Sequence, residues 1–276
     1  MASAESRRRA AVTAFLLIPA LLQLFPLFYL LGLSFKIGGE VMAYPPRLLP
    51  RALDWTNYSL ALKAAPLWRF LLNSVIVSTA ITALQVLTSI LAAYALARLE
   101  FAGRGLAFGF IMATMLVPGE ITIIPNYFAL ARLGWIDTYA GLVVPFASSG
   151  FGVFLLYQFF RTIPKELEEA AMLDGASRLR FLFQIAVPLS APAVTALAVY
   201  AFVNAWNMYL WPLVITQSTS MQTAQIGLGM FRSQNESMNW GVIMAATAML
   251  ISPTILLFVA AQRQFVRGLT TSGLKG

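Results

Sequence analysis

Residues 164–192 gather polar, helix-forming side chains in a chain that is otherwise almost free of charge. They include four carboxylates and three basic side chains, whereas charged residues make up 11% of the 276-residue sequence. Pro164 suits the first turn of a helix, where its missing N–H costs nothing. The glutamates that follow would lie near the positive end of the helix dipole, and Gly175 would supply a left-handed stop. The pattern predicts a helix over about 164–176 and a second helix capped by Ser177.

The chain offers no group for the common kinds of covalent or metal chemistry. It contains neither Cys nor His, which removes disulfides, thiol nucleophiles, thiolate metal sites and imidazole chemistry. It also lacks the G-x-x-x-x-G-K-[ST] pattern whose backbone cradles phosphates, so we expect no ATP hydrolysis by this chain. An intramembrane enzyme would need a nucleophile with a base, or metal ligands, and the sequence leaves few options for either.

The polar stretch then has two readings. It can be a solvated surface loop, or it can be a surface on which another protein docks. The paired residues Ala170 and Ala171 leave a flat patch that lets a partner approach closely. The stretch also leads directly into an apolar run, so a push on it would move that run. These two features favour docking.

Apolar runs dominate the rest of the chain and predict an all-α membrane protein. Hydrophobic residues make up 59% of the sequence, and a soluble domain carries about 25% charged residues. A bilayer core needs roughly 20 apolar residues per helix. Six transmembrane helices are predicted in a single domain of residues 1–276, at about 11–35, 71–96, 106–129, 139–160, 185–215 and 241–261. The fifth run is long, and we expect part of it to lie outside the hydrocarbon or to be broken by Pro188 and Pro192.

The counts of Lys and Arg set the predicted orientation. With the amino terminus inside, the cytoplasmic segments hold 12 basic residues and the outer segments hold 7, five of them in the loop 36–69. Both termini and the helix at 164–176 are therefore expected on the cytoplasmic side. The first apolar run follows three arginines, as in a signal peptide, but it is too long and lacks an A-x-A site, so it is read as a retained span. The net charge of +8 does not favour nucleic acid, because the basic residues are scattered.

Glu120 is the one acidic residue that falls within a predicted span. Ionisable groups in a bilayer core cost about 2.5–3.5 kcal/mol on insertion scales and usually face a cavity. Pro118 and Gly119 before it and Pro125 after it predict a broken helix, which is tolerated where it lines a cavity or is buried in protein. Glu120 is therefore a candidate for the lining of a translocation path. The alternative is a place near the outer interface, solvated or paired with Arg132.

A second candidate for the path is the polar and aromatic segment 204–211. Amides give donors and acceptors for hydroxyl groups, and aromatic faces suit the C–H surfaces of sugars or glycerol. Spacings of three and four would put Asn204, Asn207 and Trp211 on one helical face. The alternative is an aromatic belt with polar contacts between helices. The path candidates are Asn204, Trp206, Asn207, Tyr209 and Trp211, with Asn126 and Tyr127 as weaker additions.

The polar stretch resembles the EAA motif of bacterial ABC importer permeases. Over 169–188 the chain reads E-A-A, three residues, G, nine residues, I-x-V-P, with Val where the motif usually has Leu. In that family this loop is the coupling helix, which docks in a cleft of the ATPase subunit. The resemblance implies that polar contacts and close-fitting small residues lie here: Glu169, Ala170, Ala171, Asp174 and Gly175.

The resemblance covers essentially the whole chain. Six spans with both ends inside match the smaller permease of the carbohydrate-uptake type, such as the maltose permeases. The terminal FVRGLTTSGLKG is similar to the tail of that subgroup, which in the maltose system reaches between the two ATPase subunits. It implies an ATPase-contacting tail, with the residues Gly268, Thr270, Gly273 and Lys275. The alternative is a frayed terminus.

Three further segments look most like the sn-glycerol-3-phosphate (Ugp-type) permeases of the E-subunit class: VPGEITIIPNYFALARLGWIDTYAGLVVP, NAWNMYLWPLVI and QRQFVRGL. This implies half of a pathway for glycerol-3-phosphate or a glycerophosphodiester in the bacterial inner membrane. The implied partners are a second permease, two ATPase subunits that hold ATP and Mg, and a soluble or lipid-anchored binding protein. No cofactor is implied in this chain. Related sugar permeases share many of these positions, so a di- or oligosaccharide such as maltose or trehalose is the alternative cargo.

A phosphate cargo creates a tension with the sequence. Phosphate favours Arg or Lys, the predicted spans contain neither, and Glu120 would repel an anion. The partner permease can supply the cation, the binding protein can carry the discrimination, or a zwitterionic diester can place its ammonium end on Glu120. A transporter of another class, coupled to protons or sodium, would normally need several buried acids and often an internal repeat.

Overall fold

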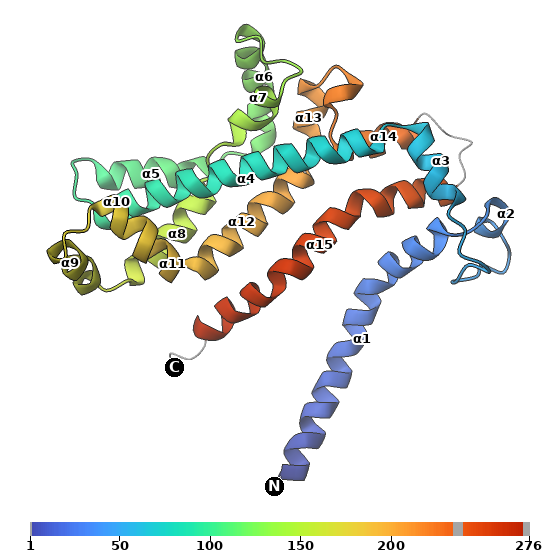
Figure 1. Ribbon diagram of the computed structural model, residues 1–276, viewed down its shortest axis with the longest axis horizontal. Helices are drawn as coiled ribbons and strands as arrows, with labels where there is room; N and C mark the ends of the chain where they lie inside the picture. Colours follow the sequence, from blue (N-terminus) through green and yellow to red (C-terminus); the bar gives the residue numbers. More distant parts are fainter. Residues whose placement is uncertain (1, 234–239, 273–276) are drawn as a thin grey trace. The chain divides into compact units, whose positions relative to one another are not determined.

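The computed structural model describes residues 2–233 and 240–272, and every regular element within them is helical. Figure 1 shows their course along the chain. The α-helices are α1 (Ala2–Ser34), α2 (Gly38–Val41), α3 (Thr56–Ala64), α4 (Leu67–Arg98), α5 (Arg104–Thr114), α6 (Ile123–Arg132), α7 (Tyr139–Val143), α8 (Gly150–Thr162), α9 (Lys165–Leu173), α10 (Arg178–Phe181), α11 (Val187–Leu189), α12 (Ala191–Trp206), α13 (Leu210–Ile215), α14 (Ala224–Ser233) and α15 (Trp240–Ser272). The shorter turns are η1 (Gly119–Thr122), η2 (Val144–Phe146), the π-helical η3 (Leu182–Ala186) and η4 (Thr219–Met221).

Three helices are long and apolar enough to cross a membrane by themselves, and three more spans arise if each bent helix pair counts as one. The single helices are Val12–Ser34, Leu67–Arg98 and Trp240–Leu257. The bent pairs are Arg104–Thr114 with Gly119–Arg132, Tyr139–Phe146 with Gly150–Thr162, and Arg178–Leu189 with Ala191–Trp206. Each predicted apolar run thus has a helix or a helix pair, and the fifth run, 185–215, continues past α12 into α13.

Proline accounts for the sharpest bends. The 94° bend between α5 and α6 contains Pro118 and Gly119. Pro118 has no backbone N–H, so it cannot donate the hydrogen bond that would continue the helix. The 82° bend before α12 falls at Ser190, which lies between Pro188 and Pro192. Its backbone N–H donates to the carbonyls of Ala186 and Val187, so this buried break keeps its donor satisfied.

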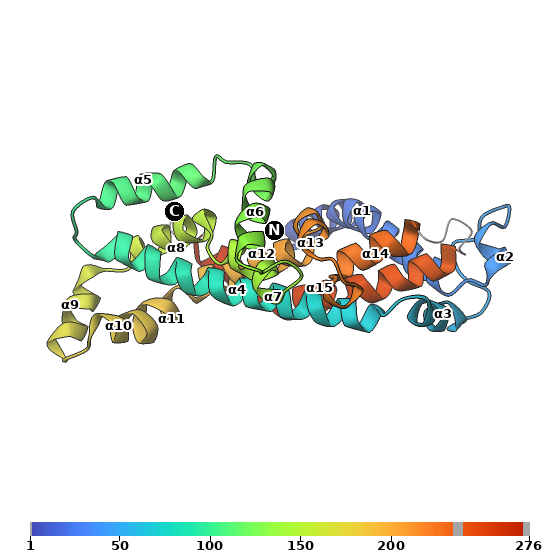
Figure 2. The ribbon, with the colours of Figure 1, turned by 90° about the horizontal axis from the view of Figure 1, so that it is seen from above.

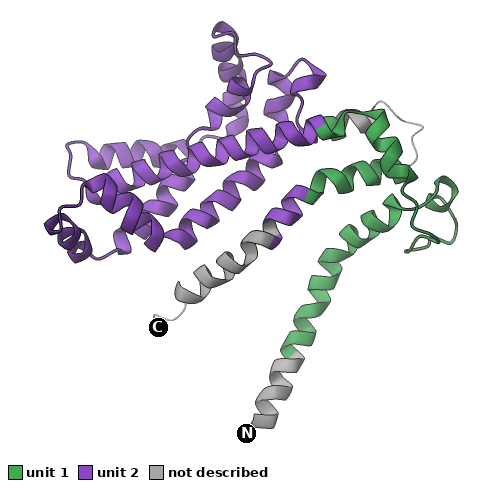
Figure 3. Ribbon diagram, viewed as in Figure 1, with its two compact units in different colours: residues 1–68, 227–252 green, residues 69–226, 253–276 purple. Residues whose placement is uncertain are grey.

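The chain divides into two compact units, residues 1–68 with 227–252 and residues 69–226 with 253–276 (Figure 3). In the second unit α4 packs against α8 and α12, and α5 packs against α8 (Figures 1 and 2). Two buried apolar clusters hold it together. One joins α4, α8, α10 and α12 around Leu156, Phe160 and Leu197, and the other joins α4, α7 and α13 around Ile81, Leu142 and Ile215.

Gly141 allows α7 to pack closely on its neighbours. A Cβ at this position would collide with the carbonyl oxygen of Trp135 and approach Ile215. The indole Nε1 of Trp211 donates to the Gly141 carbonyl at 3.0 Å. Thr138 caps the same helix, because its hydroxyl accepts the Gly141 N–H at 3.1 Å.

Unit 1 has a buried network of hydrogen bonds where α1 ends. The amide of Asn57 donates to the carbonyls of Ser34 (3.0 Å) and Lys36 (2.7 Å), and the Ser34 hydroxyl pairs with the Tyr58 hydroxyl at 2.9 Å. Lys36 is 2% exposed, and its ammonium donates to the carbonyl of Arg47. These hydrogen bonds hold the 36–69 loop, which contains α2 and α3, against the end of α1.

Asp137 ties the turn before α7 to the segment after α13. Its carboxylate accepts the backbone N–H groups of Gln217 (2.9 Å) and Ser218 (3.1 Å). Burial alone would raise the pKa of Asp137, but the hydrogen bonds from the Ser218 side chain and from the backbone of Ser218 and Gln217 outweigh it and hold the pKa below its ordinary value. Asp137 has a positive φ of 57°, a conformation that Asp tolerates better than most residues.

Asn73 in α4 holds the same segment from the other side. It is fully buried, and its amide donates to the carbonyls of Ser220 and Gln222, each at 2.8 Å. Its own oxygen accepts the hydroxyl of Tyr139 at 2.7 Å. One side chain therefore satisfies three polar groups from two other segments.

We expect Asn73→Ala to destabilise the fold, because it leaves two carbonyls and a hydroxyl without their partner. An unsatisfied buried group costs roughly 1–3 kcal/mol, so the thermal midpoint of the purified protein in detergent should fall by at least about 5 °C. Tyr139→Phe removes one of these hydrogen bonds and should have a smaller effect. Equal midpoints for all three proteins would contradict this assignment.

Candidate functional site

Helix α9 is a short helix that begins after Pro164 and has a hydrogen-bonded cap at its C-terminal end. At its end, the N–H of Gly175 donates to the Met172 carbonyl and the N–H of Ala176 donates to the Ala171 carbonyl. This is the Schellman pattern, with Gly175 in the left-handed conformation at φ +82°. The predicted left-handed stop at Gly175 is confirmed. So is the cap at Ser177, whose hydroxyl accepts the N–H of Arg180 at 3.3 Å.

The two alanines of α9 have different surroundings. Ala170 is exposed, as are Glu169, Asp174 and Gly175. Ala171 is only 7% exposed and packs into the first apolar cluster. The expectation that both alanines form one flat outer patch is therefore wrong, because neighbouring helical residues point about 100° apart and the chain's own core covers the second.

The outer surface of α9 is apolar as well as charged, which the sequence reasoning missed. Leu173 is 90% exposed, and Leu167 and Met172 are also exposed. Leu173 follows Ala171 by two positions, so it lies about 200° around the helix from the buried side. The two-residue spacing would have predicted an exposed Leu173 from the sequence if Ala171 had been known to face the core. Leu167, Met172 and Leu173 together give α9 an exposed apolar surface beside its carboxylates and lysine.

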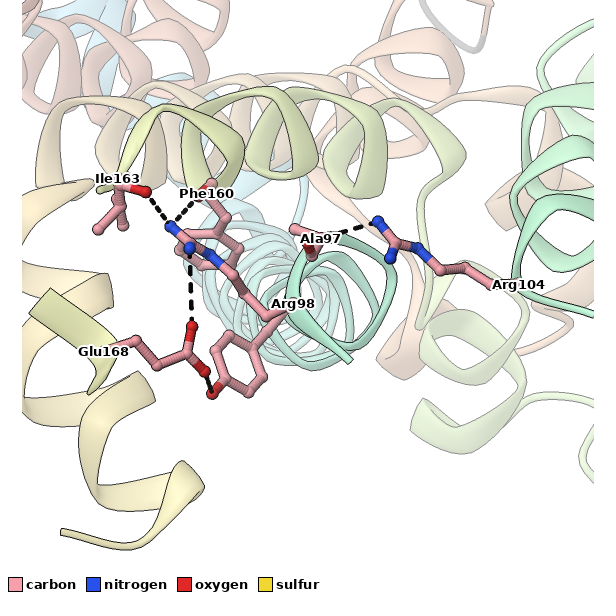
Figure 4. A network of polar contacts seen from close by, with 7 residues as sticks. Ala97, Arg98, Arg104, Phe160, Ile163 and Glu168 are labelled. Carbon is pink, nitrogen blue, oxygen red and sulfur yellow. Dashed lines mark hydrogen bonds and ion pairs between the residues drawn. The ribbon is translucent and has the colours of Figure 1, made fainter. Parts of the chain in front are cut away.

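Helix α9 is anchored to the spans through Glu168, another residue that the sequence reasoning missed (Figure 4). One carboxylate oxygen accepts the hydroxyl of Tyr94 at 2.9 Å, and the other lies 3.6 Å from the guanidinium of Arg98. The same guanidinium donates to the carbonyls of Phe160 (2.7 Å) and Ile163 at the end of α8. No pattern in the sequence links these residues, because the partners lie 62–74 positions apart.

A charged groove of about 460 Å³ lies beside this anchor. It runs between the end of α4, the start of α5, the end of α8 and α9. Its lining residues are Ala97, Arg98, Glu100, Arg104, Arg161, Ile163, Lys165, Glu168, Glu169 and Met172. Its lining includes four cations and three carboxylates, so the groove has no strong excess of one charge.

The structure places Glu120 at the break between α5 and α6. It lies in η1, directly after Pro118, and its side chain is exposed. Asn126 and Tyr127 follow on α6 and are half-buried, and Tyr127 packs against the second apolar cluster. These three candidates therefore lie on one short segment, with Glu120 nearest the bend.

The segment 204–211 does not form one helix. Helix α12 ends at Trp206, and α13 starts at Leu210. The prediction that Asn204, Asn207 and Trp211 share a helical face is wrong for this reason.

The tryptophans and the amides of this segment separate. Trp206 and Trp211 are 2% and 3% exposed and pack inside the chain. Asn204, Asn207 and Tyr209 are exposed. The structure therefore keeps the amides and the tyrosine on the surface and takes both indoles into the interior.

Gln225 of α14 joins the exposed amides and was not found from the sequence. Its side-chain N–H donates to the Asn207 oxygen at 3.2 Å. The side-chain amide of Asn204 donates to the carbonyl of Tyr200 at 2.8 Å. Asn204 also lies at the edge of a largely apolar groove of about 490 Å³, which is lined by Phe151, Leu155, Ala196, Val199, Tyr200, Val203 and Asn204.

The tail residues divide at the end of the described chain. Gly268 and Thr270 lie on the last part of α15, and Gly273 and Lys275 lie outside the described residues.

Within the part of the chain that the structure describes, no three acidic side chains gather closely enough to hold a metal ion.

Comparison with known proteins gives consistent matches. Residues 85–271 match the family model described as "Binding-protein-dependent transport system inner membrane component". The chain is 38% identical over 264 residues to the sn-glycerol-3-phosphate transport system permease protein UgpE of Yersinia pestis bv. Antiqua (strain Antiqua), across 93% of this chain and 94% of that one. The protein of the same name from Escherichia coli O1:K1 / APEC is 38% identical over 257 residues, across 90% and 91%.

A solved structure shares the fold. A chain in the crystal structure of a bacterial ABC transporter involved in the import of the acidic polysaccharide alginate superposes with a TM-score of 0.82. The sequence identity is 26%, and the match covers 94% of this chain and 97% of that one.

The different surroundings of the two alanines can be tested by paired substitutions. Ala171→Leu overfills the cluster beneath α9 and should cost roughly 1–3 kcal/mol of folding free energy. Ala170→Leu adds the same side chain to an exposed position and should change stability by no more than about 0.5 kcal/mol. Thermal unfolding of the two purified variants would measure the difference. Equal loss in both would contradict the burial of Ala171.

Proposed function

Because the chain belongs to the family of binding-protein-dependent transport system inner membrane components, we propose that it is one permease of an ATP-driven importer for glycerol-3-phosphate or a glycerophosphodiester. The names of its relatives support this cargo. In the proposed assembly this chain forms half of the pathway in the bacterial inner membrane, and a second permease forms the other half. Two ATPase subunits hold ATP and Mg, and a soluble or lipid-anchored binding protein delivers the cargo.

The observation that carries the proposal is the surface of α9. This helix lies outside the helices that could span the membrane, yet it exposes Leu173 at 90% among charged side chains. A surface of this kind suits a protein partner better than water or lipid. We place α9 and both termini on the cytoplasmic side, where α9 acts as the coupling helix. Glu169, Ala170, Asp174 and Gly175 supply its exposed polar and close-fitting contacts.

The proposed path uses polar groups that the chain exposes. Glu120 lies on the bend between α5 and α6, and Asn204, Asn207 and Gln225 offer amides near the end of α12. Amides can bond the hydroxyl groups of glycerol. Since the predicted spans of this chain carry no Lys or Arg, the cation for a phosphate is assigned to the partner permease or to the binding protein.

A saccharide is the second candidate cargo. The exposed amides together with Tyr209 suit a neutral sugar and need no cation. The structural neighbour with 26% identity belongs to an importer of the acidic polysaccharide alginate, which supports a saccharide but not its neutrality. A di- or oligosaccharide such as maltose or trehalose would use the same path and the same coupling helix.

Reconstitution of the complete complex tests the transport role. We expect ATP-dependent uptake of glycerol-3-phosphate into vesicles, and ATP hydrolysis that rises when loaded binding protein is added. A wild-type complex that takes up no tested cargo in the presence of ATP would contradict the proposal.

Substitution of Gly175 tests docking. Gly175→Trp should remove the stimulation of ATP hydrolysis while the chain still folds, because bulk is placed on the docking surface. Gly175→Asn is the control, since Asn tolerates a positive φ and a Cβ here meets no atom of this chain within 4 Å. It should retain most of the stimulation. Normal stimulation in Gly175→Trp would count against α9 as the coupling helix.

Calorimetry on the cognate binding protein tests the cargo separately. We expect binding of glycerol-3-phosphate or glycerophosphocholine, and no binding of maltose or trehalose. Binding of a sugar alone would replace the proposed cargo with the second candidate and would leave the importer role unchanged.

A further inference from the structure

The covalent route from α9 into the membrane is interrupted several times. After α9 the chain makes a left-handed turn at Gly175, a single turn of α10 and the π-helical turn η3. It then bends by 82° at Ser190 before α12 begins. A π-turn and a sharp bend are places where a helix yields. A displacement of α9 would therefore be partly absorbed before it reaches α12.

A second route bypasses these joints through side chains. Arg98 is the last residue of α4, a continuous helix of 32 residues. Its guanidinium pairs with Glu168 on α9 and donates to two carbonyls at the end of α8 (Figure 4). Tyr94, one turn earlier on α4, donates to the other oxygen of the same carboxylate. Both oxygens of Glu168 are thus held by α4.

This bridge is largely shielded from water. The side chains of Arg98 and Glu168 are 6% and 14% exposed. An ion pair with this little exposure is weakly screened, and removal of one partner leaves the other charge without compensation. Ordinary exposed ion pairs hold two surfaces together weakly. The shielding makes this one suited to carry a displacement between two helices.

We propose that Arg98 is a positioning residue that makes α4 and the end of α8 move together with α9 through the carboxylate of Glu168. The inference rests on the proposed function, since α9 must be the helix that the ATPase displaces. It adds a route for that displacement into the longest uninterrupted span of the second unit. Loss of the bridge should then leave ATP hydrolysis running while transport per ATP falls.

The experiment uses the complete complex in vesicles and measures cargo uptake and ATP hydrolysis on the same preparation. Glu168→Ala should lower uptake per ATP at least about fivefold, the lower end of typical coupling effects. Glu168→Gln keeps one acceptor oxygen and should recover part of that ratio, and Tyr94→Phe should give a smaller loss. Glu100→Ala is the matched control, because it removes an exposed carboxylate from the same groove and leaves the bridge intact.

The outcomes separate this inference from the transport role. A wild-type complex without ATP-dependent uptake overturns the proposed function before any variant is compared. With an active wild type, an unchanged ratio in Glu168→Ala overturns the positioning role. So does a parallel loss of uptake and hydrolysis, which would show that the bridge only stabilises the assembly. If Glu168→Ala does not assemble, the ratios in Glu168→Gln and Tyr94→Phe decide in the same way.

A covalent replacement of the bridge gives an independent readout. The chain has no Cys, so Tyr94→Cys with Glu168→Cys introduces the only two thiols of this chain. Joining them with a short, cleavable bifunctional thiol reagent should restore uptake per ATP, and cleavage should lower it again. A ratio that does not respond to the cross-link would overturn the proposal.

Discussion

The absence of water in a bilayer core governs this structure, because every backbone polar group there needs a partner within the protein. Long helices meet this requirement by themselves, and every regular element of the described residues is helical. Breaks in the helices cost free energy, because they leave backbone N–H and C=O groups without their helical partners. At Ser190 the bend keeps its backbone donor bonded to the preceding turn. After α13 the irregular segment is satisfied by Asn73 and Asp137, which reach it from two other elements.

The same constraint separates the roles of the polar side chains. Those that are buried serve the fold: Asn57, Asn73 and Arg98 each bond at least two carbonyls. Those that are exposed at a break, such as Glu120 and Asn207, are the ones proposed to meet cargo. A single buried amide or guanidinium thus stabilises several segments of the chain.

Helix α9 combines two properties that the proposed coupling role requires. Its outer side carries Leu173 and exposed carboxylates for a partner, and its inner side places Ala171 in the apolar cluster and Glu168 on α4. A helix held only by its exposed contacts would shift without moving the spans. Packing and a shielded ion pair therefore act on the same side of α9, which supports the proposed transmission of motion from this helix to α4.

The sequence by itself determined the helical class, the positions of the apolar runs, the polar helix with its stop at Gly175, and the cap of the next helix at Ser177. These features depend on local composition, on hydrophobic length and on backbone preferences within a few residues. Only the tertiary structure decided which side of α9 faces outward, that Trp206 and Trp211 are buried, and that Arg98 meets Glu168. Such contacts join residues that are dozens of positions apart, and a pattern read along one chain carries no information on which helices become neighbours.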